Sequence, residues 1–273
     1  MALKLFYITN NPDVAIIAEK YGVDRIFVDL ETLDKEKRQQ GMDTVKSSHT
    51  PADVKAVKSV LTKAKLLARV NRWNENSKKE IDDVINAGAD IVMLPYWKTA
   101  EEVKNFIDAV GGRAKVLPLL ETKEAFECLP EVLKLEGIEE IHVGLNDLHI
   151  SYGQKFLFEP LANGTLDEIA SQVKAAGKSF GFGGIAKLGE GMLPAEKIVM
   201  EHYRLGSSMV ILSRTFCDTS KCCDINEIDN LFKQNVKALR DFEESLKSAS
   251  EEDYAKNKES VKLAVESICT KIS

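Results

Sequence analysis

Two short apolar runs near the middle of the chain each end in a carboxylate. The first leads from Val116 to Glu121, and the second leads from Ile141 to Asp147. If both runs are strands of one parallel barrel, their carboxyl ends meet at the same mouth. Neighbouring carboxylates repel unless a cation lies between them, and Mg²⁺ prefers one or two carboxylates completed by water and substrate oxygens. Glu121 and Asp147 are therefore predicted to bind a divalent metal ion. The alternative is that they cap the following helices, although Thr122 would cap better than Glu121.

A second charged group, Arg69, lies inside an apolar run, where a permanent charge needs a partner. Its guanidinium can grip a substrate carboxylate at two points, or it can form an internal ion pair with Asp29 or Glu31. Spacing alone leaves both interpretations open. The loop from Thr32 to Thr50 is longer than most barrel connections. It carries His49, which is either an acid–base group brought over the mouth or a surface histidine beside a helix start.

The elements that must position these groups are eight apolar or β-branched runs separated by helical patterns. Near-continuous apolar runs are typical of parallel strands covered on both faces. Eight strand–helix repeats in 273 residues predict an α/β fold, a (β/α)₈ TIM barrel, rather than an open doubly wound sheet. The predicted strands are Leu3–Thr9, Arg25–Glu31, Lys65–Asn71, Asp90–Tyr96, Lys115–Glu121, Glu140–Asp147, Ser179–Ile185 and Ser208–Arg214.

Helical patterns fill the connections, and an extended C-terminal helical segment follows the last strand. A barrel needs one closing helix, so of the patterns Asp224–Lys247 and Glu251–Ile272 the second is surplus. We expect residues 1–220 to form the barrel core and residues 221–273 to pack on it, or on a neighbouring subunit, within the same domain. The surplus apolar positions favour a homo-oligomer. The helices predicted between the strands are Asp13–Tyr21, Pro51–Ala64, Asn76–Ala87, Thr99–Val110, Lys123–Leu135, Thr165–Ala176 and Pro194–Tyr203.

Three other features lie near the last strands. The glycine-rich stretch Phe180–Ile185 either helps to bind phosphate, as loops after strands seven and eight often do, or permits close backbone approach. His142 lies inside the sixth predicted strand and is expected in the core or facing outward. His202 precedes the eighth strand, so we expect it in a packing network at the far end of the barrel.

Composition excludes several classes of function. The net charge is −6, with lysines and acids interspersed, so a nucleic-acid partner is not expected. The longest apolar stretches are strand-sized, so no membrane span is predicted. The first residues lack the pattern of a signal peptide, and the five scattered cysteines lack zinc-site spacing. Both observations predict a reduced, cytoplasmic protein.

Five segments resemble, in order and spacing, the HpcH/HpaI aldolase and citrate lyase β-subunit family. The resemblance implies a TIM barrel that holds Mg²⁺ or Mn²⁺ and that makes or breaks a carbon–carbon bond beside a carbonyl group. The matching segments are Val28–Glu31, Ala68–Asn71, Gly88–Pro95, Leu119–Thr122 and Gly144–Leu148.

The likeness also assigns roles to residues. It places Glu121 and Asp147 at the metal-ligand positions and Arg69 at the position of the arginine that binds the keto acid. Asn146 falls where backbone amides hold the substrate carboxylate, and we count Asp29 with the substrate-binding residues. Proton transfer is expected to use metal-bound hydroxide or His49, with Glu31 behind it.

The chain departs from the family pattern after the second strand. The aldolase branch carries a histidine base directly after the glutamate, where this chain has Thr32. The acyl-CoA branch has an acidic residue there and basic residues further along, which Lys35, Lys37 and Arg38 partly match. The match after Leu205, including the C-terminal helices, is poor for both branches.

The expected function is that of a divalent-metal-dependent aldolase or carbon–carbon lyase that acts on a hydroxy-keto acid through a pyruvate-type enolate. Its partners would be a small keto acid and an aldehyde or acyl-CoA. One alternative is an acyl-CoA lyase of the malyl-, citramalyl- or citryl-CoA type. Another is a non-catalytic barrel subunit, which the missing histidine and the surplus helix allow.

Overall fold

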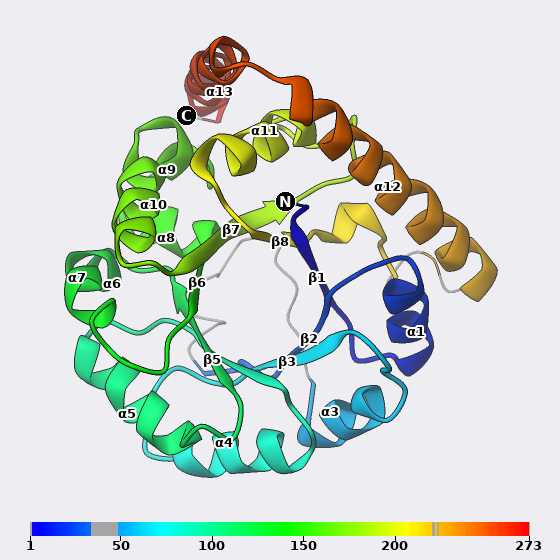
Figure 1. The fold of residues 1–273 in the computed structure, drawn as a ribbon, viewed down its shortest axis with the longest axis vertical. Helices are drawn as coiled ribbons and strands as arrows, with labels where there is room; N and C mark the ends of the chain where they lie inside the picture. The colour runs from blue at the N-terminus through cyan, green and yellow to red at the C-terminus, as the bar shows by residue number, and fades with distance from the viewer. Residues whose placement is uncertain (1, 34–48, 220–221, 223, 273) are drawn as a thin grey trace.

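Eight parallel strands form a closed barrel in chain order, and helices surround it (Figure 1). The structure is a computed structural model that describes residues 2–33, 49–219, 222 and 224–272. The predicted barrel is confirmed, and each strand lies within the run predicted for it. The strands are β1 (Lys4–Ile8), β2 (Arg25–Asp29), β3 (Lys65–Arg69), β4 (Ile91–Leu94), β5 (Lys115–Leu120), β6 (Glu140–Val143), β7 (Ser179–Ile185) and β8 (Met209–Leu212).

The helices between the strands are α1 (Pro12–Lys20), α3 (Pro51–Lys58), α4 (Ser77–Asn86), α5 (Ala100–Val110), α6 (Lys123–Glu127), α7 (Leu129–Val132), α8 (Leu145–Ser151), α9 (Glu159–Ala162), α10 (Thr165–Ala175) and α11 (Ala195–Leu205). Four of the helices between the strands, α1, α3, α5 and α6, begin at residues whose side chains cap them. Thr50 and Thr99 each form a capping box with the acidic residue three positions later.

Two of the predicted helices were too long. The helix predicted to reach Ala64 ends at Lys58, and the chain turns there toward β3. The helix predicted over 123–135 is broken at Cys128 into α6 and α7. Pro130 explains the break, because proline has no N–H to continue the hydrogen-bond ladder of a helix.

The barrel interior is filled mostly by apolar side chains, with charge at its floor. Inward-facing positions alternate along the strands, and the interior cluster comprises Phe6, Phe27, Leu67, Ile91, Met93, Leu117, Leu119 and Met209. At the amino-terminal ends of β2 and β6, Arg25 Nη2 donates to Glu140 Oε1 at 2.5 Å, and both residues are buried. His142 lies in the interior against Phe6, so of the two positions expected for it, core or outward-facing, the structure has the core position.

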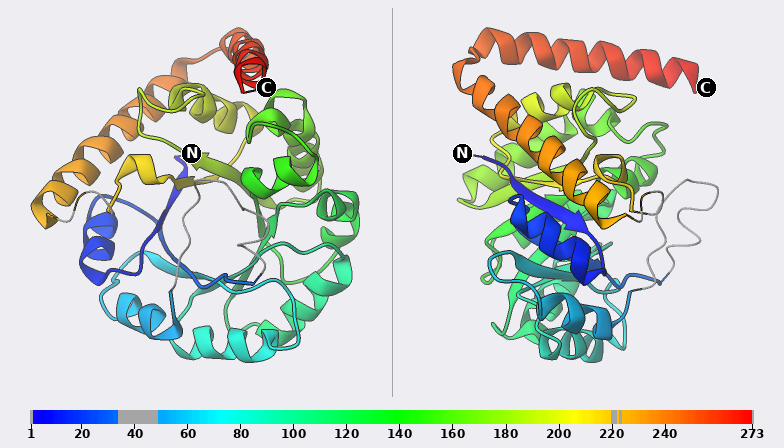
Figure 2. Two further views of the ribbon diagram at one scale, coloured as in Figure 1. Left: turned by 180° about the vertical axis from the view of Figure 1, so that it is seen from behind. Right: turned by 90° about the vertical axis from the view of Figure 1, so that its right-hand side faces the viewer.

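The chain ends in η1 (Arg214–Phe216), α12 (Ile225–Ser245), η2 (Leu246–Ser248) and α13 (Glu251–Lys271). Helix α12 packs along α1, and α13 lies across α11 and α9 (Figure 2). Asn257 of α13 is buried, and its amide donates to Glu201 Oε1 at 2.9 Å. The surplus helix thus covers the outside of its own barrel, while contact with a second subunit stays a prediction. Within the described ranges, no helix is both long and apolar enough to cross a membrane.

Candidate active site

Arg69 is the last residue of β3 and is paired in register with Asp29, the last residue of β2. Its Nε and Nη2 donate to the two oxygens of Asp29, both at 2.8 Å, and Nη1 lies 3.5 Å from Glu31 Oε2. All three side chains are largely buried. Of the two interpretations left open by the sequence, the structure therefore contains the internal ion pair.

The electrostatic surroundings keep this arginine charged. Burial disfavours its charge, but the carboxylates of Asp29 and Glu31, with a further contribution from Glu121, outweigh that effect and raise the pKa of Arg69 well above its usual value. The two bonds to Asp29 use two of its five N–H groups. The ion pair therefore holds the guanidinium rigid without using all of its donors.

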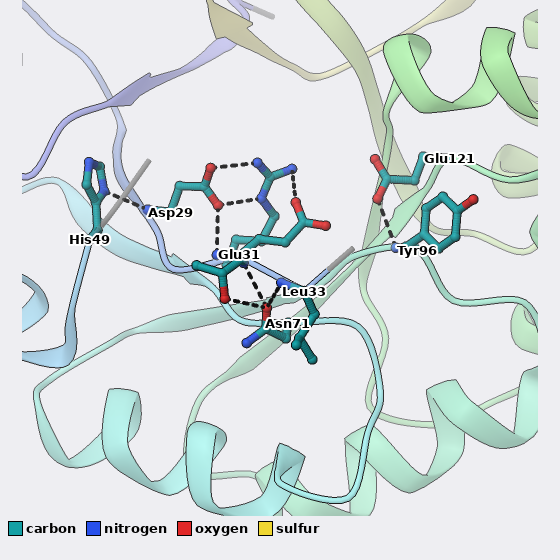
Figure 3. A network of polar contacts seen from close by, with 9 residues as sticks. Asp29, Glu31, Leu33, His49, Asn71, Tyr96 and Glu121 are labelled. Carbon is teal, nitrogen blue, oxygen red and sulfur yellow. Dashed lines mark hydrogen bonds and ion pairs between the residues drawn. The ribbon is translucent and has the colours of Figure 1, made fainter. Parts of the chain in front are cut away.

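Glu121 follows β5 directly and is 2 % exposed. Its Oε1 accepts the backbone N–H of Tyr96 at 2.8 Å (Figure 3). Tyr96 has a φ of 50°, an uncommon conformation for a residue with a side chain, and such strain is often found at functional sites. Thr122, not Glu121, caps α6, because its hydroxyl accepts from Ala125 N at 3.0 Å. Glu121 is thus held in place without serving as a helix cap.

Asp147 lies in the first turn of α8 and is 7 % exposed. Gly144 occupies the N-cap of α8, and no side chain caps the helix there. Gly144 also adjoins Glu121, because a Cβ at this glycine would lie 2.7 Å from Glu121 Oε2. The β5 and β6 ends therefore bring both predicted metal ligands to one side of the mouth.

The donor set at this side fits a magnesium-type site. No group of three or more His, Cys, Asp or Glu side chains suited to a metal occurs in the part of the chain that the structure describes. Two buried carboxylates nevertheless match the coordination preference of Mg²⁺, which keeps several water or substrate oxygens in its coordination shell. A closed zinc-type site, which needs four protein ligands, finds no support here.

His49 lies on the other side of the mouth from Glu121, with Asp29 between them (Figure 3). Its Nδ1 accepts the backbone N–H of Asp29 at 3.0 Å, so a neutral ring carries its proton on Nε2. Protonating Nδ1 would break that bond, so in this position the ring offers Nε2–H as a hydrogen-bond donor and its Nδ1 is not available as a base. His49 also lines a cavity of about 320 Å³ with residues at the ends of β1 and β8, among them Thr9, Asn10, Ser213 and Arg214.

The structure describes only some of the other residues that the sequence singled out. Asn146 lies half-buried in the first turn of α8. Thr32, at the place of the aldolase histidine, donates its N–H to Asn71 Oδ1 at 2.8 Å, and Leu33 does the same at 2.9 Å. The basic residues of the acyl-CoA pattern, Lys35, Lys37 and Arg38, lie outside the described residues.

Sequence reasoning missed three supporting groups. The side chain of Asn71 accepts a backbone N–H from the loop after β2. The Tyr96 amide donates to Glu121, and Gly144 has no Cβ that would collide with the Glu121 carboxylate. Asn71 and Gly144 stand in the matching segments, so a role could have been suspected. The Tyr96 amide gave no signal, because a backbone contact does not depend on residue type.

The sequence model of the HpcH/HpaI aldolase/citrate lyase family matches residues 3–189, more than half of the chain. The chain belongs to this family. Because the match includes every strand end from β1 to β7, it covers Asp29, Arg69, Glu121 and Asp147.

Characterised members with similar sequences are aldolases. The chain is 25 % identical over 143 residues to 2-keto-3-deoxy-L-rhamnonate aldolase of Escherichia coli K12, which covers 41 % of this chain and 54 % of that enzyme. It is 20 % identical over 202 residues to 4-hydroxy-2-oxo-heptane-1,7-dioate aldolase of Shigella sonnei, covering 61 % and 72 %. The chain thus spans about half the length of the rhamnonate aldolases that it matches.

Solved structures of the family share the fold. An HpcH/HpaI aldolase from Desulfitobacterium hafniense DCB-2 superposes with a TM-score of 0.59 at 15 % identity, covering 77 % of this chain and 86 % of the other. A family protein from Burkholderia cenocepacia J2315 gives 0.61 at 14 % identity, covering 88 % and 94 %.

Proposed function

We propose that this protein is a divalent-metal-dependent aldolase or carbon–carbon lyase that acts on a hydroxy-keto acid through a pyruvate-type enolate. The observation that carries the proposal is the gathering of Arg69 with Asp29 and Glu31 at the same mouth as Glu121 and Asp147. Enolate chemistry needs positive charge where negative charge develops, and a rigid guanidinium beside a dication site supplies it.

The carboxylates of Glu121 and Asp147 would hold Mg²⁺ or Mn²⁺. When bound, such an ion supplies Lewis-acid stabilisation of the developing enolate charge. The Tyr96 amide and Gly144 keep the Glu121 carboxylate oriented before substrate arrives. This pre-organisation avoids a reorganisation cost during the reaction.

Arg69 would orient the carboxylate and carbonyl oxygens of the keto acid. Asp29 fixes the guanidinium from behind through two hydrogen bonds, and Glu31 stands beside it. In this arrangement Asp29 acts on the substrate through Arg69 and not by direct contact. Glu31 has the same indirect role.

His49 would offer its Nε2 N–H as a hydrogen-bond donor to a substrate oxygen rather than remove a proton through Nδ1, since Nδ1 accepts the Asp29 amide. Deprotonation in the cleavage direction would then depend on a water or hydroxide at the mouth. This arrangement differs from that of the aldolase branch, in which a single histidine directly after the β2 glutamate acts as the base.

The names of the aldolase relatives support the substrate class. Both act on acids that carry a 2-keto group, one derived from a deoxy sugar and one from a dicarboxylic chain. The second substrate of this chain would accordingly be an aldehyde, while an acyl-CoA thioester is the alternative that the family description "aldolase/citrate lyase" leaves open.

The proposal can be tested without knowing the aldehyde. An enzyme that forms the pyruvate enolate should exchange the methyl protons of pyruvate for deuterium in D₂O, which proton NMR follows directly. We expect exchange with Mg²⁺ or Mn²⁺, none with EDTA, and a loss of about 100-fold in Asp147→Asn, as when one group that stabilises developing charge is removed. Absence of exchange with every divalent ion, with pyruvate and acetyl-CoA alike, would favour the non-catalytic subunit instead.

A further inference from the structure

His142 is a buried histidine that the proposed reaction leaves without a role. It lies on β6, two residues before Gly144, and none of its surface is exposed. Its ring centroid is 5.7 Å from that of Phe6 in the barrel interior. Burial lowers the pKa of His142 to about 4, so the ring is neutral at pH 7. An apolar side chain of this size would fill the space at lower desolvation cost.

The side chain makes one hydrogen bond, and it goes to the backbone of β7. His142 Nε2 lies 3.2 Å from the carbonyl oxygen of Gly183, so the neutral ring must carry its proton on Nε2 and donate it. Within the described part of the chain, Nδ1 has no hydrogen-bond partner. The favourable contact that offsets the burial of the imidazole is therefore the bond to Gly183.

Gly183 occupies a special position in β7. Its φ is 51°, a left-handed conformation that favours glycine. The pairing of β7 with β8 shifts register between Gly181 and Gly184, so Gly183 lies within a bulge. A Cβ at Gly183 would lie 2.9 Å from Leu145 Cδ1. The glycine-rich stretch thus permits close approach to the neighbouring element, whereas its predicted role in phosphate binding stays untested.

Leu145 is the first residue of α8 and is 1 % exposed. Asp147 follows it in the same helical turn. On its other side this turn adjoins β5, because Gly144 lies against Glu121. The start of α8 therefore lies between the β7 bulge, at Leu145, and the Glu121 carboxylate, at Gly144. A change in the bulge can reach Asp147 through Leu145.

We propose that His142 is a positioning residue for the two carboxylates. By donating to the Gly183 carbonyl it fixes the β7 bulge against Leu145 and so sets the place of Asp147 beside Glu121. The part that concerns metal binding rests on the proposed function. The ordering of α8 by His142 does not depend on a metal.

The test is His142→Phe, which keeps a planar ring against Phe6 and removes the donor. Two properties are measured: hydrogen exchange of the backbone amides in residues 144–151, and the Kd for Mn²⁺ by electron paramagnetic resonance. We expect exchange about tenfold faster and Mn²⁺ binding about tenfold weaker, the lower end of the loss expected when a supporting contact behind a metal ligand is removed. The urea midpoint at pH 7 should not fall, because the variant also removes a buried polar group.

Two variants serve as controls. His142→Gln retains an N–H donor and should recover part of both properties. His202→Phe changes the other fully buried histidine, which stacks on Phe182 with ring centroids 3.7 Å apart and bonds to Ser207. Because it does not bond to Gly183, its effect on both properties should be smaller than that of His142→Phe. If His142→Phe does not fold, His142→Leu removes the same donor to the Gly183 carbonyl and gives the same test.

The outcomes separate this inference from the proposed function. If the wild type binds no Mn²⁺ but His142→Phe loosens α8, the metal site is wrong and the positioning of α8 stands. If exchange in residues 144–151 is unchanged in His142→Phe, the positioning inference is overturned whether or not metal binds. If exchange rises but the Kd for Mn²⁺ of a metal-binding wild type is unaffected, the link from α8 to the site is overturned.

Discussion

The barrel buries two arginines against carboxylates, one at its floor and one at its mouth, and their surroundings differ. At the floor, Arg25 pairs with the single carboxylate of Glu140 at 2.5 Å, and Lys4 Nζ lies 3.9 Å from the other oxygen of that carboxylate. At the mouth, Arg69 pairs with Asp29 and Glu31, and the charge of Glu121 also acts on it. A matched buried pair is a structural device. At the mouth, carboxylates outnumber the arginine, and Glu121 is held by the Tyr96 amide and not by the guanidinium.

The largest effect is expected at the floor and concerns stability. Arg25→Met leaves Glu140 buried without its main partner, which should lower the free energy of unfolding by about 3–5 kcal/mol. The remaining folded protein should keep its pyruvate exchange rate, because the floor takes no part in the chemistry. Urea unfolding measures the first quantity and proton NMR the second.

The matched control for the floor is the double variant Arg25→Met/Glu140→Leu. Replacing a whole buried pair with apolar side chains is often neutral or stabilising, so the double variant should recover most of the loss. If the double variant is as unstable as Arg25→Met, then Arg25 does not stabilise the fold through its ion pair with Glu140.

The second prediction concerns His142, which lies between the floor and the mouth, and the loss of stability that its titration causes at acid pH. Burial lowers the pKa of His142 from 6.5 to about 4, so between these values the unfolded chain binds a proton that the folded chain does not. Stability is therefore full above pH 6.5 and falls as the pH drops toward 4, by about 3 kcal/mol from this residue. His202, whose pKa burial also lowers, acts in the same direction.

Urea unfolding at several pH values tests this. His142→Phe should show a smaller loss of stability between pH 6.5 and pH 4 than the wild type. An equally steep loss in the variant would mean that His142 already titrates normally in the folded chain.

The third prediction concerns the geometry of the mouth. Arg69→Lys keeps the charge but loses the two-point grip on Asp29, so kcat/KM should fall about tenfold or more. Arg69→Ala is a poorer test, because it would leave Asp29 and Glu31 buried beside no guanidinium and destabilise the fold. The corresponding floor variant, Arg25→Lys, should change the free energy of unfolding and leave kcat/KM unaltered. If Arg69→Lys and Arg25→Lys lower kcat/KM equally, the mouth and the floor do not differ in their role in catalysis.

The smallest predicted effect is that of one methyl group at the mouth. Gly144 has a φ of −85°, which any residue can adopt, so Gly144→Ala adds no backbone strain. Its Cβ would lie 2.7 Å from Glu121 Oε2, and Mn²⁺ binding should weaken about fivefold. In Gly184→Ala the nearest contact is 3.3 Å from Ile211 O, and the Kd should not change. Equal Kd values for the two variants would contradict the placement of Glu121.

The sequence was sufficient to predict the barrel and the set of residues at its mouth. Apolar runs mark buried strands locally, and parallel strands in a barrel bring their carboxyl ends together whatever the details of packing. Arg69 and Glu121 could therefore be assigned to one end from their places in the runs. Asp147, which was predicted to end the sixth strand, lies instead in the first turn of α8, beyond the end of β6 at Val143.

The sequence offered an internal ion pair of Arg69 with Asp29 or Glu31 as one of two interpretations. It could not choose between the two, because the choice depends on contacts between distant segments. The choice of Asp29 as the partner of Arg69 follows from the register of β2 and β3. The proton position on His49 follows from the Asp29 amide, and the fixing of Glu121 follows from the unusual φ of Tyr96. None of these has a local signal in residue type or spacing.

The most direct test of the account is a calorimetric titration of Mn²⁺ and Mg²⁺ into the metal-free protein and three variants. Glu121→Gln and Asp147→Asn each alter one carboxylate at the mouth, and Glu139→Gln alters an exposed acid at the floor that pairs with Lys115. We predict one ion per wild-type chain, binding weakened at least about tenfold in both mouth variants, and unchanged binding in the floor variant. A wild type that binds no divalent ion, or an Asp147→Asn variant that binds with wild-type affinity, would contradict it.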